Sequence, residues 1–222
     1  MSSECSAIDI YNEITNITAY VIEQGICDVG NYPSIYDNNR KIDFQGSNLI
    51  SKALKDKGYE YIYKQLKENR LFNIKFLDGA LLQFMYAFDN NRLKKHRLAF
   101  YPSPHLENFG ENPENYMKDK LYMEIVGRRI VPFPIRFDFD IEAYQDVKHP
   151  KSHLTLGDVE NCRIPVSSPL TPYNFLKFIL SNFYCTDEYE FISKLPPSKL
   201  EFNNTISDNE KLIMYISIPC KR

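Results

Sequence analysis

The sequence predicts an α+β fold, in which an antiparallel sheet packs against helices from both ends of the chain. Three observations support this prediction. Residues 7–23 carry apolar side chains at helical spacing, residues 135–141 alternate apolar and polar side chains as a half-buried strand does, and residues 171–184 begin with a strong helix-start signal. The predicted sheet combines a three-stranded meander with central and C-terminal strands.

The length and composition favour one folded unit. A chain of 222 residues with 43% hydrophobic and 25% charged residues can bury a substantial core. No repeat, low-complexity tract or linker divides it. We therefore expect a single α+β domain over residues 1–222, with a helical part over about 1–70 and the sheet and C-terminal helix over about 71–222.

The N-terminal part is predicted to be helical with one irregular connection. In segment Ala7 to Glu23 the apolar residues recur at helical spacing, and Gly25 marks the end of that helix; they are Ile10, Ile14, Ile17 and Val21. Residues 27–46 are rich in Asn, Asp, Gly and Pro and predict a long irregular connection. A second helix is expected from Ser47 to Leu66, weakened or broken at Gly58.

A meander of three antiparallel strands is expected next. Leu71 to Leu77 and Ala80 to Phe88 flank Asp78-Gly79, a signal for a type I′ turn. Asp89-Asn90-Asn91 turns the chain again, and His96 to Tyr101 predicts the third strand. Residues 102–115 read as a loop, and the periodicity of residues 118–126 fits a helix or a strand equally.

The C-terminal part begins with a helix. Thr171 supplies an N-cap hydroxyl and Pro172 suits the first helical position, so the helix should reach about Tyr184. Its expected core stripe is Phe175, Ile179 and Phe183. A short helix over residues 187–194 and a final strand over residues 211–218 complete the prediction.

The central stretch holds the densest mixture of Arg, Asp and His in the chain. Between Ile135 and Ile141 the polar positions are Arg136, Asp138 and Asp140, which a strand directs to one face. If residues 152–156 form the neighbouring strand, His153 and Thr155 share that face, and His149 lies at the mouth of the connection. The apolar positions Phe137, Phe139, Leu154 and Leu156 should then be buried beneath the helix of residues 171–184.

Four motifs carry a resemblance to a known family. They are Arg136-Phe137-Asp138-Phe139-Asp140, His149-Pro150-x-Ser152-His153-Leu154-x-x-Gly157, Cys162-Arg163-Ile164-Pro165-Val166, and Pro169-Leu170-Thr171-Pro172 followed by the helix to Tyr184. With these motifs the chain resembles a bacterial family of uncharacterised proteins, a domain of unknown function. The resemblance implies no activity, substrate or catalytic residue. The genes found beside such proteins imply a defence-associated setting.

The candidate catalytic residues are Arg136, Asp138, Asp140, His149 and His153. Carboxylates and imidazoles bind divalent metals, and an arginine beside them holds a phosphate oxygen, so the set suits phosphoester hydrolysis. A histidine working as general acid or base without a metal fits equally, because its pKa lies near neutrality. The sequence leaves the need for a divalent metal open. A solvated ladder of charges that contributes little to stability is the competing interpretation.

Arg163, Arg97 and Lys95 are the candidate substrate-binding residues. Arg163 either clamps a phosphate or forms a salt bridge with Asp138, Asp140 or Asp158. Lys95 and Arg97 belong to the basic run of residues 92–97, which grips a nucleic-acid backbone or forms a solvated hairpin shoulder. The aromatic residues close to it in sequence are candidate base-stacking groups: Tyr86, Phe100 and Tyr101. Cys162 could act as a nucleophile with His153 as its base, or be an inert buried thiol.

The net charge and the absence of several motifs disfavour some classes of protein. A net charge of −2 gives no general attraction to polyanions, and the phosphate-loop, dinucleotide, serine-hydrolase and EF-hand signatures are absent. The N-terminus lacks the pattern of a signal peptide, and no run approaches about 18 apolar residues, so no membrane association is expected. Five scattered cysteines without a C-x-x-C pair fit reduced thiols in the cytoplasm.

Two functions remain open from the sequence. The first is a phosphoester- or nucleic-acid-processing enzyme with the Arg/Asp/His site above, in the defence-associated setting that the resemblance implies. The alternative is a non-catalytic partner-binding protein of a two-component defence or toxin–antitoxin pair. The enzyme hypothesis requires Asp138 and His153 to lie within about 12 Å of each other, the reach of one shared ligand. The oligomeric state cannot be read from the residues.

Overall fold

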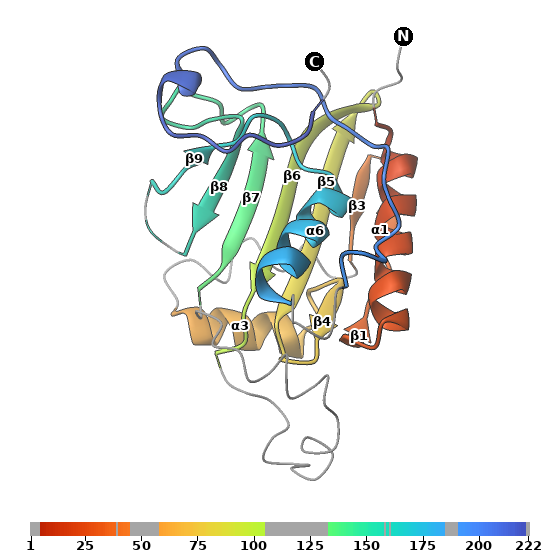
Figure 1. Ribbon diagram of the computed structural model, residues 1–222. Coiled ribbons are helices and arrows are strands. Elements are labelled where there is room, and N and C mark those ends of the chain that lie inside the picture. The colour runs from red at the N-terminus through yellow and green to blue at the C-terminus, as the bar shows by residue number, and fades with distance from the viewer. Residues whose placement is uncertain are drawn as a thin grey trace.

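The computed structural model describes residues 5–38, 40–44, 58–104, 133–157, 159, 161–184 and 191–220 of the chain. Within these residues a sheet of nine strands forms the centre of the molecule, and helices pack against it (Figure 1). The sheet order is β1-β4-β5-β6-β7-β8-β9, with β3 also pairing β5 and β2 pairing β3. Every paired strand is antiparallel to its neighbour, so the α+β prediction is confirmed.

The described elements have these bounds. The helices are α1 Ala7–Glu23, α3 Tyr59–Glu68, α6 Pro172–Phe183 and the short 3₁₀ helix η2 Glu210–Leu212. The strands are β1 Cys27–Gly30, β2 Ser34–Tyr36, β3 Lys41–Asp43, β4 Ile74–Phe76, β5 Leu81–Asp89, β6 Arg92–Tyr101, β7 Ile135–Asp140, β8 Ser152–Leu156 and β9 Ile164–Pro165.

Helix α1 has the predicted bounds because residues at each of its ends carry a capping signal. The Ser6 side chain accepts a hydrogen bond from the Asp9 N–H, and the Asp9 carboxylate accepts one from the Ser6 N–H, which completes a capping box. Gly25 has a φ of 69°, a backbone conformation that ends helices and suits glycine. The four predicted core residues of this helix are all buried: Ile10, Ile14, Ile17 and Val21.

The meander is present with both turns at the predicted positions, but the type of the first turn differs from the prediction. At Asp78-Gly79 only Gly79 has a positive φ, of 82°, whereas a type I′ turn requires positive φ at both central residues. That requirement is met between β5 and β6, where Asn90 and Asn91 have φ values of 47° and 62°. Strand β6 therefore begins at Arg92, and the basic run of residues 92–97 lies within the strand.

Helix α6 covers one face of the sheet, as predicted. The Thr171 hydroxyl accepts a hydrogen bond from the Asn174 N–H, with Pro172 at the first helical position. The Phe175 ring packs edge-on against Phe84 and Phe137, with 5.9 Å between ring centroids in both pairs. Phe137, Phe139 and Leu154 are buried as expected, while Leu156 is half-buried at the edge of this core.

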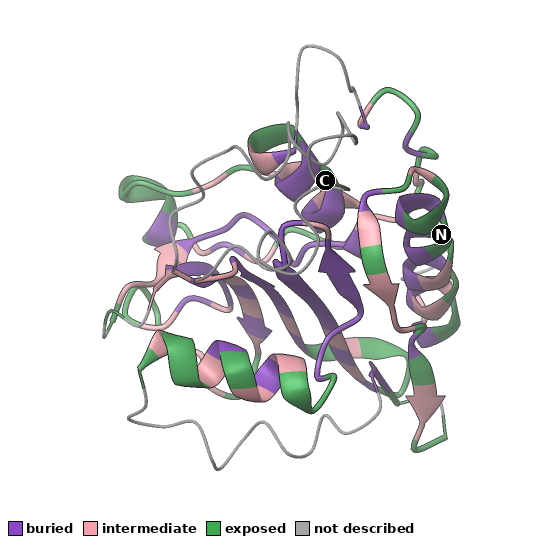
Figure 2. Cartoon of the chain, turned by 90° about the horizontal axis from the view of Figure 1, so that it is seen from below, coloured by how far each residue is buried: buried purple, intermediate pink, exposed green. Residues whose placement is uncertain are grey.

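The opposite face of the sheet has its own apolar contacts. Figure 2 shows α3 on the side of the sheet opposite α6. A second core cluster lies there, with residues from α3, the β3–β6 region and the connection after α3; it contains Phe44, Tyr63, Leu66, Leu71, Phe72, Leu81, Ala99 and Tyr101. This cluster lies at the Tyr101 end of β6. Other side chains line the rest of the sheet face on which α3 packs.

Two parts of the prediction need correction. Residues 27–46, expected to be irregular, contain three short strands: β1 pairs β4, β3 pairs β5, and β2 pairs β3. Residues 211–218 do not form a strand, because η2 takes up Leu212 and the segment joins the sheet through one parallel bridge, Ile216 to Val166. The N-terminal part of the predicted second helix and residues 105–126 and 187–190 lie outside the described residues.

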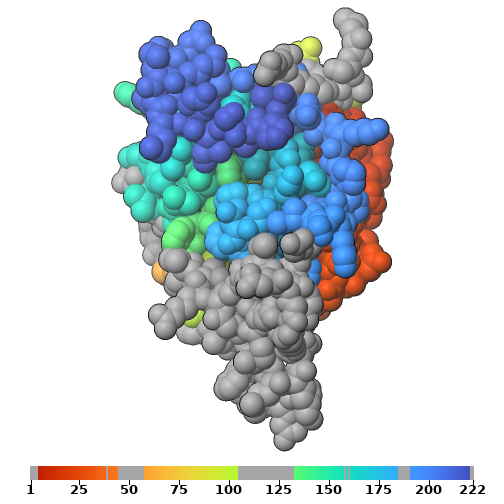
Figure 3. Space-filling view, viewed as in Figure 1, coloured from red at the N-terminus to blue at the C-terminus, as the bar shows by residue number. Residues whose placement is uncertain are grey.

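The C-terminal segment passes over one end of the sheet. In the space-filling view, residues 191–220 run alongside α1 and across the end of the sheet near β8 and β9 (Figure 3). Asp146, in the β7–β8 connection, accepts hydrogen bonds of 2.6 Å from both Ser207 and Asn209 and so holds this segment to the sheet. No helix in the described part of the chain has the length and apolar character needed to cross a bilayer.

Candidate functional site

Strands β6, β7 and β8 bring the charged residues of the central stretch onto one face of the sheet. Because side chains alternate along β7, Arg136, Asp138 and Asp140 point away from the face that α6 covers. The strand register then sets their neighbours. Arg97 on β6 lies opposite Asp138, and Asp138 lies opposite His153 on β8, so these three form one row across three strands.

A pocket of about 400 Å³ opens on this face. All of the residues predicted as site residues line it; they are Arg136, Asp138, Asp140, His149, His153, Arg163, Arg97 and Lys95. The other lining residues are Phe139, Thr155, Val159, Asn161 and Cys162. Strand pairing and the return of the chain before β9 are therefore enough to gather groups spread over residues 95–163.

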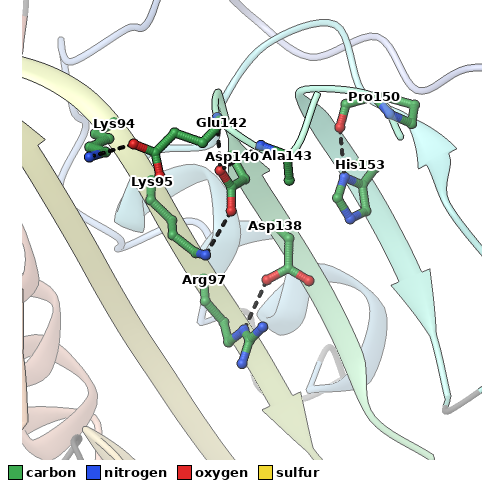
Figure 4. Close-up of polar contacts among 9 residues, drawn as sticks. All are labelled: Lys94, Lys95, Arg97, Asp138, Asp140, Glu142, Ala143, Pro150 and His153. Atoms are coloured by element: carbon green, nitrogen blue, oxygen red, sulfur yellow. Dashed lines mark hydrogen bonds and ion pairs between the residues drawn. The ribbon is translucent and has the colours of Figure 1, made fainter. Parts of the chain in front are cut away.

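Asp138 lies at the centre of the row and is held ionised by arginine. Its Oδ1 accepts a hydrogen bond from Arg97 Nε at 3.0 Å (Figure 4). Its Oδ2 lies 3.8 Å from Arg136 Nε. Burial alone would raise the pKa of Asp138, but the charges of Arg97 and Arg136 outweigh it and hold that pKa below its usual range. Its side chain is 15% exposed, so this carboxylate is not part of a fully solvated ladder.

Asp140 forms a second ion pair at the loop end of β7. Lys95 Nζ lies 2.7 Å from its Oδ2, and its Oδ1 accepts hydrogen bonds from the N–H groups of Glu142 and Ala143 (Figure 4). Burial opposes ionisation, but the bonds from Lys95 and the backbone dominate and lower the pKa of Asp140. This carboxylate also caps the turn that leads out of the strand.

His153 is held in one tautomer by the backbone. Its Nδ1 lies 2.9 Å from the carbonyl oxygen of Pro150, which can only accept a hydrogen bond, so Nδ1 carries the proton (Figure 4). Nε2 of the neutral ring therefore keeps its lone pair. Burial lowers the pKa of His153, and the charge of Asp138 together with the Pro150 bond offsets this only in part. The ring is thus neutral at physiological pH and able to take a proton.

A second imidazole contacts His153. His149 and His153 lie with 4.9 Å between ring centroids, edge to face. The His149 N–H donates to the Gln145 carbonyl at 2.7 Å, and the return hydrogen bond closes the turn between β7 and β8. The four-residue spacing of the two histidines thus comes from a turn followed by a strand, and not from one face of a helix.

Arg163 does not form the salt bridges that were predicted with Asp138 and Asp140. Those two carboxylates are paired with Arg97 and Lys95, and Arg163 Nη1 donates instead to the Asn161 side-chain oxygen at 3.1 Å. The third predicted partner, Asp158, lies outside the described residues. Arg163 thus lines the pocket with its charge directed to no carboxylate among the described residues.

The prediction that aromatic residues near the basic run stack bases is wrong. Tyr86, Phe100 and Tyr101 are 3%, 0% and 7% exposed and belong to the two cores. His96, in the middle of the basic run, is also buried on the α6 side, where its Nε2 accepts a hydrogen bond from the Leu170 N–H at 3.2 Å. The run therefore contributes Lys95 and Arg97 to the pocket but no aromatic platform.

The sequence did not single out Asn161 and gave Thr155 no role, although both line the pocket. Their positions could have indicated them, since Asn161 precedes Arg163 by two residues and Thr155 follows His153 by two on the same strand face.

Among the described residues, no group of three or more His, Cys, Asp and Glu side chains is placed to hold a metal ion.

Comparison with known proteins identifies the family without an activity. Residues 26–218 match the family model described as "Uncharacterized conserved protein (DUF2290)". No curated protein and no solved structure matches the chain.

Proposed function

The chain belongs to the DUF2290 family of uncharacterised conserved proteins, and from its pocket we propose that it is a phosphoester-processing enzyme, with nucleic acids among its substrates. The carrying observation is that arginines, carboxylates and a neutral histidine from separate segments line one pocket. Such convergence of titratable groups with shifted pKa values favours a functional site over a solvated charge ladder.

In the proposed mechanism, His153 is the general base. Its Nε2 takes the proton of an attacking water or hydroxyl as the new bond to phosphorus forms, and the ester oxygen leaves from the opposite side. His149, in contact with His153, supplies a second imidazole for protonating the leaving oxygen. Arg136 and Arg163 hold the phosphate oxygens and stabilise the charge that develops on them.

Asp138 is a positioning residue in this scheme. Its carboxylate fixes Arg97 and lies beside Arg136, which restricts the guanidinium groups that face the substrate. It also opposes His153 across the strand pair, where its negative charge stabilises the imidazolium formed when His153 accepts a proton.

The experiment is a hydrolysis assay with purified protein on aryl phosphates, aryl phosphodiesters, RNA and DNA. It is run with EDTA and with added Mg²⁺ or Mn²⁺, because carboxylates and imidazoles also suit divalent cations. His153→Ala should abolish turnover, and free imidazole should restore part of it, while Lys94→Ala, which removes a cation paired with Glu142, should leave turnover unchanged. Equal turnover by wild type and His153→Ala would refute the assignment.

A partner-binding function is the second candidate, supported by one surface feature. Consecutive apolar side chains around η2 are exposed, with Leu212 84% and Met214 86% accessible. Isolated exposed apolar residues are common, but a cluster on one segment marks a contact surface. Co-expression with the product of the neighbouring gene tests this function. A stoichiometric complex lost in Leu212→Ser/Met214→Ser would support it, and no complex would count against it.

The cellular setting that we propose is the cytoplasm. The four cysteines that the structure describes form no disulfide with one another, as expected in a reducing compartment; they are Cys5, Cys27, Cys162 and Cys220.

A further inference from the structure

The cations of the pocket divide into two kinds. Lys95 and Arg97 each contact a carboxylate directly, at 2.7 Å and 3.0 Å. Arg136 lies farther from its carboxylate, 3.8 Å from Asp138, and Arg163 contacts no carboxylate among the described residues. Among the described lining residues, four cationic side chains face two carboxylates, so the pocket carries an excess of two positive charges when its histidines are neutral.

Arg136 is held beside Asp138 without bonding to it. Among the described residues its buried Nε has no hydrogen-bond partner, and the nearest carboxylate oxygen, Asp138 Oδ2, lies at 3.8 Å, beyond hydrogen-bond range. The Arg136 side chain is 26% exposed and lines the pocket, so the outer guanidinium N–H groups, and not the buried Nε, are the donors that a bound ligand can reach.

Arg163 reaches the pocket from the other side. It lies just before β9, and its described hydrogen bond is to the neutral side chain of Asn161. This bond orients the guanidinium without pairing it with a carboxylate of the described residues. Its charge also reaches His153, whose pKa it helps to lower. The two arginines therefore both line the pocket in which the His153 ring lies.

We propose that the pocket binds a terminal phosphate, the dianion of a phosphomonoester, between the guanidinium groups of Arg136 and Arg163. A terminal phosphate offers three free oxygens and nearly two negative charges, which matches two forked cations. An internal phosphodiester offers two free oxygens and one charge. This inference rests on the proposed function and names its substrate class: esters at the end of a chain or on a small molecule.

The test measures binding by calorimetry, independently of turnover. The probes are one DNA oligonucleotide with a 5′-phosphate, the same oligonucleotide with a 5′-hydroxyl, a nucleoside monophosphate and inorganic phosphate. We expect the 5′-phosphate to strengthen oligonucleotide binding at least tenfold. Equal affinity for the two oligonucleotides, together with no binding of the monophosphate or of inorganic phosphate, would overturn the proposal.

The three probes that carry a terminal or free phosphate show which kind of molecule supplies the phosphate. Tightest binding of the 5′-phosphorylated oligonucleotide assigns the site to nucleic-acid ends, and tightest binding of the monophosphate assigns it to nucleotides. Tightest binding of inorganic phosphate assigns it to the phosphoryl group alone. Each of these results supports a terminal-phosphate site.

Variants then connect the binding to the two arginines. Arg136→Ala and Arg163→Ala should each weaken binding of the preferred probe about 10- to 100-fold, the effect of losing a charge-assisted hydrogen bond. Arg136→Lys keeps the charge and loses the fork, so it should give an intermediate loss. Lys94→Ala is the matched control and should bind as wild type does. Unchanged binding in both arginine variants would refute the clamp.

The outcomes for this inference and for the proposed function are separate. Tight binding of a terminal phosphate without turnover of any ester would leave the clamp standing and reject the enzyme. Hydrolysis of internal phosphodiesters, lost in His153→Ala and accompanied by no preference for a terminal phosphate, would keep the enzyme and reject the clamp.

Discussion

Asp138 on β7 and His153 on β8 are direct cross-strand partners, with Arg97 on β6 opposite the other side of Asp138. Residues opposed in this way have Cα atoms about 4.5–5.5 Å apart, well inside the reach of one ligand. The geometric requirement of the enzyme hypothesis is therefore met. The charge of Asp138 also acts on His153, which makes the pKa of that histidine a direct probe of the site.

The first prediction is that two substitutions shift the pKa of His153 in opposite directions. Asp138→Asn removes the negative charge that favours the imidazolium, so the pKa of His153 should fall further. Arg163→Ala removes a nearby positive charge, so the same pKa should rise. An NMR titration of the histidine ring resonances measures both changes, with Lys94→Ala as the control. Shifts of the same sign in the two variants would contradict the arrangement.

The second prediction concerns the ion pair between Arg97 and Asp138. A double-mutant cycle with Arg97→Met and Asp138→Asn, followed by urea unfolding, should give a coupling free energy of about 1 kcal/mol, because the arginine is partly exposed. The pair between Lys94 and Glu142 is more exposed and should give a smaller coupling. Equal coupling free energies for the two pairs would show that the pocket does not strengthen the ion pair between Arg97 and Asp138.

The third prediction concerns acid stability. Burial lowers the pKa of His96 to about 3, while in the unfolded chain it returns to about 6.5. Between these values the unfolded chain binds a proton that the folded chain does not. The free energy of unfolding should therefore be unaffected by His96 above about pH 6.5 and fall by about 1.4 kcal/mol per pH unit below it.

His96→Gln tests this reasoning, because glutamine can still accept the Leu170 hydrogen bond but does not titrate in this range. Urea unfolding between pH 7.5 and 4.5 should show a shallower loss of stability in the variant than in wild type. Parallel curves for the two proteins would mean that His96 is not the group responsible.

The fourth prediction concerns the attachment of α6 to the sheet. Phe175 is fully buried between Phe84 and Phe137, so Phe175→Ala should lower the free energy of unfolding by about 3–5 kcal/mol. Phe178, half-buried on the same helix, is the matched position, and Phe178→Ala should cost less. Thermal and urea unfolding measure both, and a reversed order would contradict the packing.

Local patterns in the sequence determined the elements whose stabilising contacts are close along the chain. The helical spacing of apolar residues in Ala7–Glu23, the N-cap at Thr171 and the alternation through Ile135–Asp140 each predicted an observed element. A cap or an alternating pattern depends on residues a few positions apart, so it is visible before the chain folds. The α+β class followed from these elements.

Tertiary pairing decided what those patterns could not. Strands β1 and β3 carry little hydrophobic signal and form because β4 and β5 offer them backbone partners, and β2 then pairs β3. The register of β6 against β7 placed Arg97 opposite Asp138 at the pocket, and placed the buried His96 opposite Phe139 on the other face. The sequence by itself determined which residue types face each side of a strand. Only the folded sheet decided which strand lies beside which, because those hydrogen bonds join residues far apart along the chain.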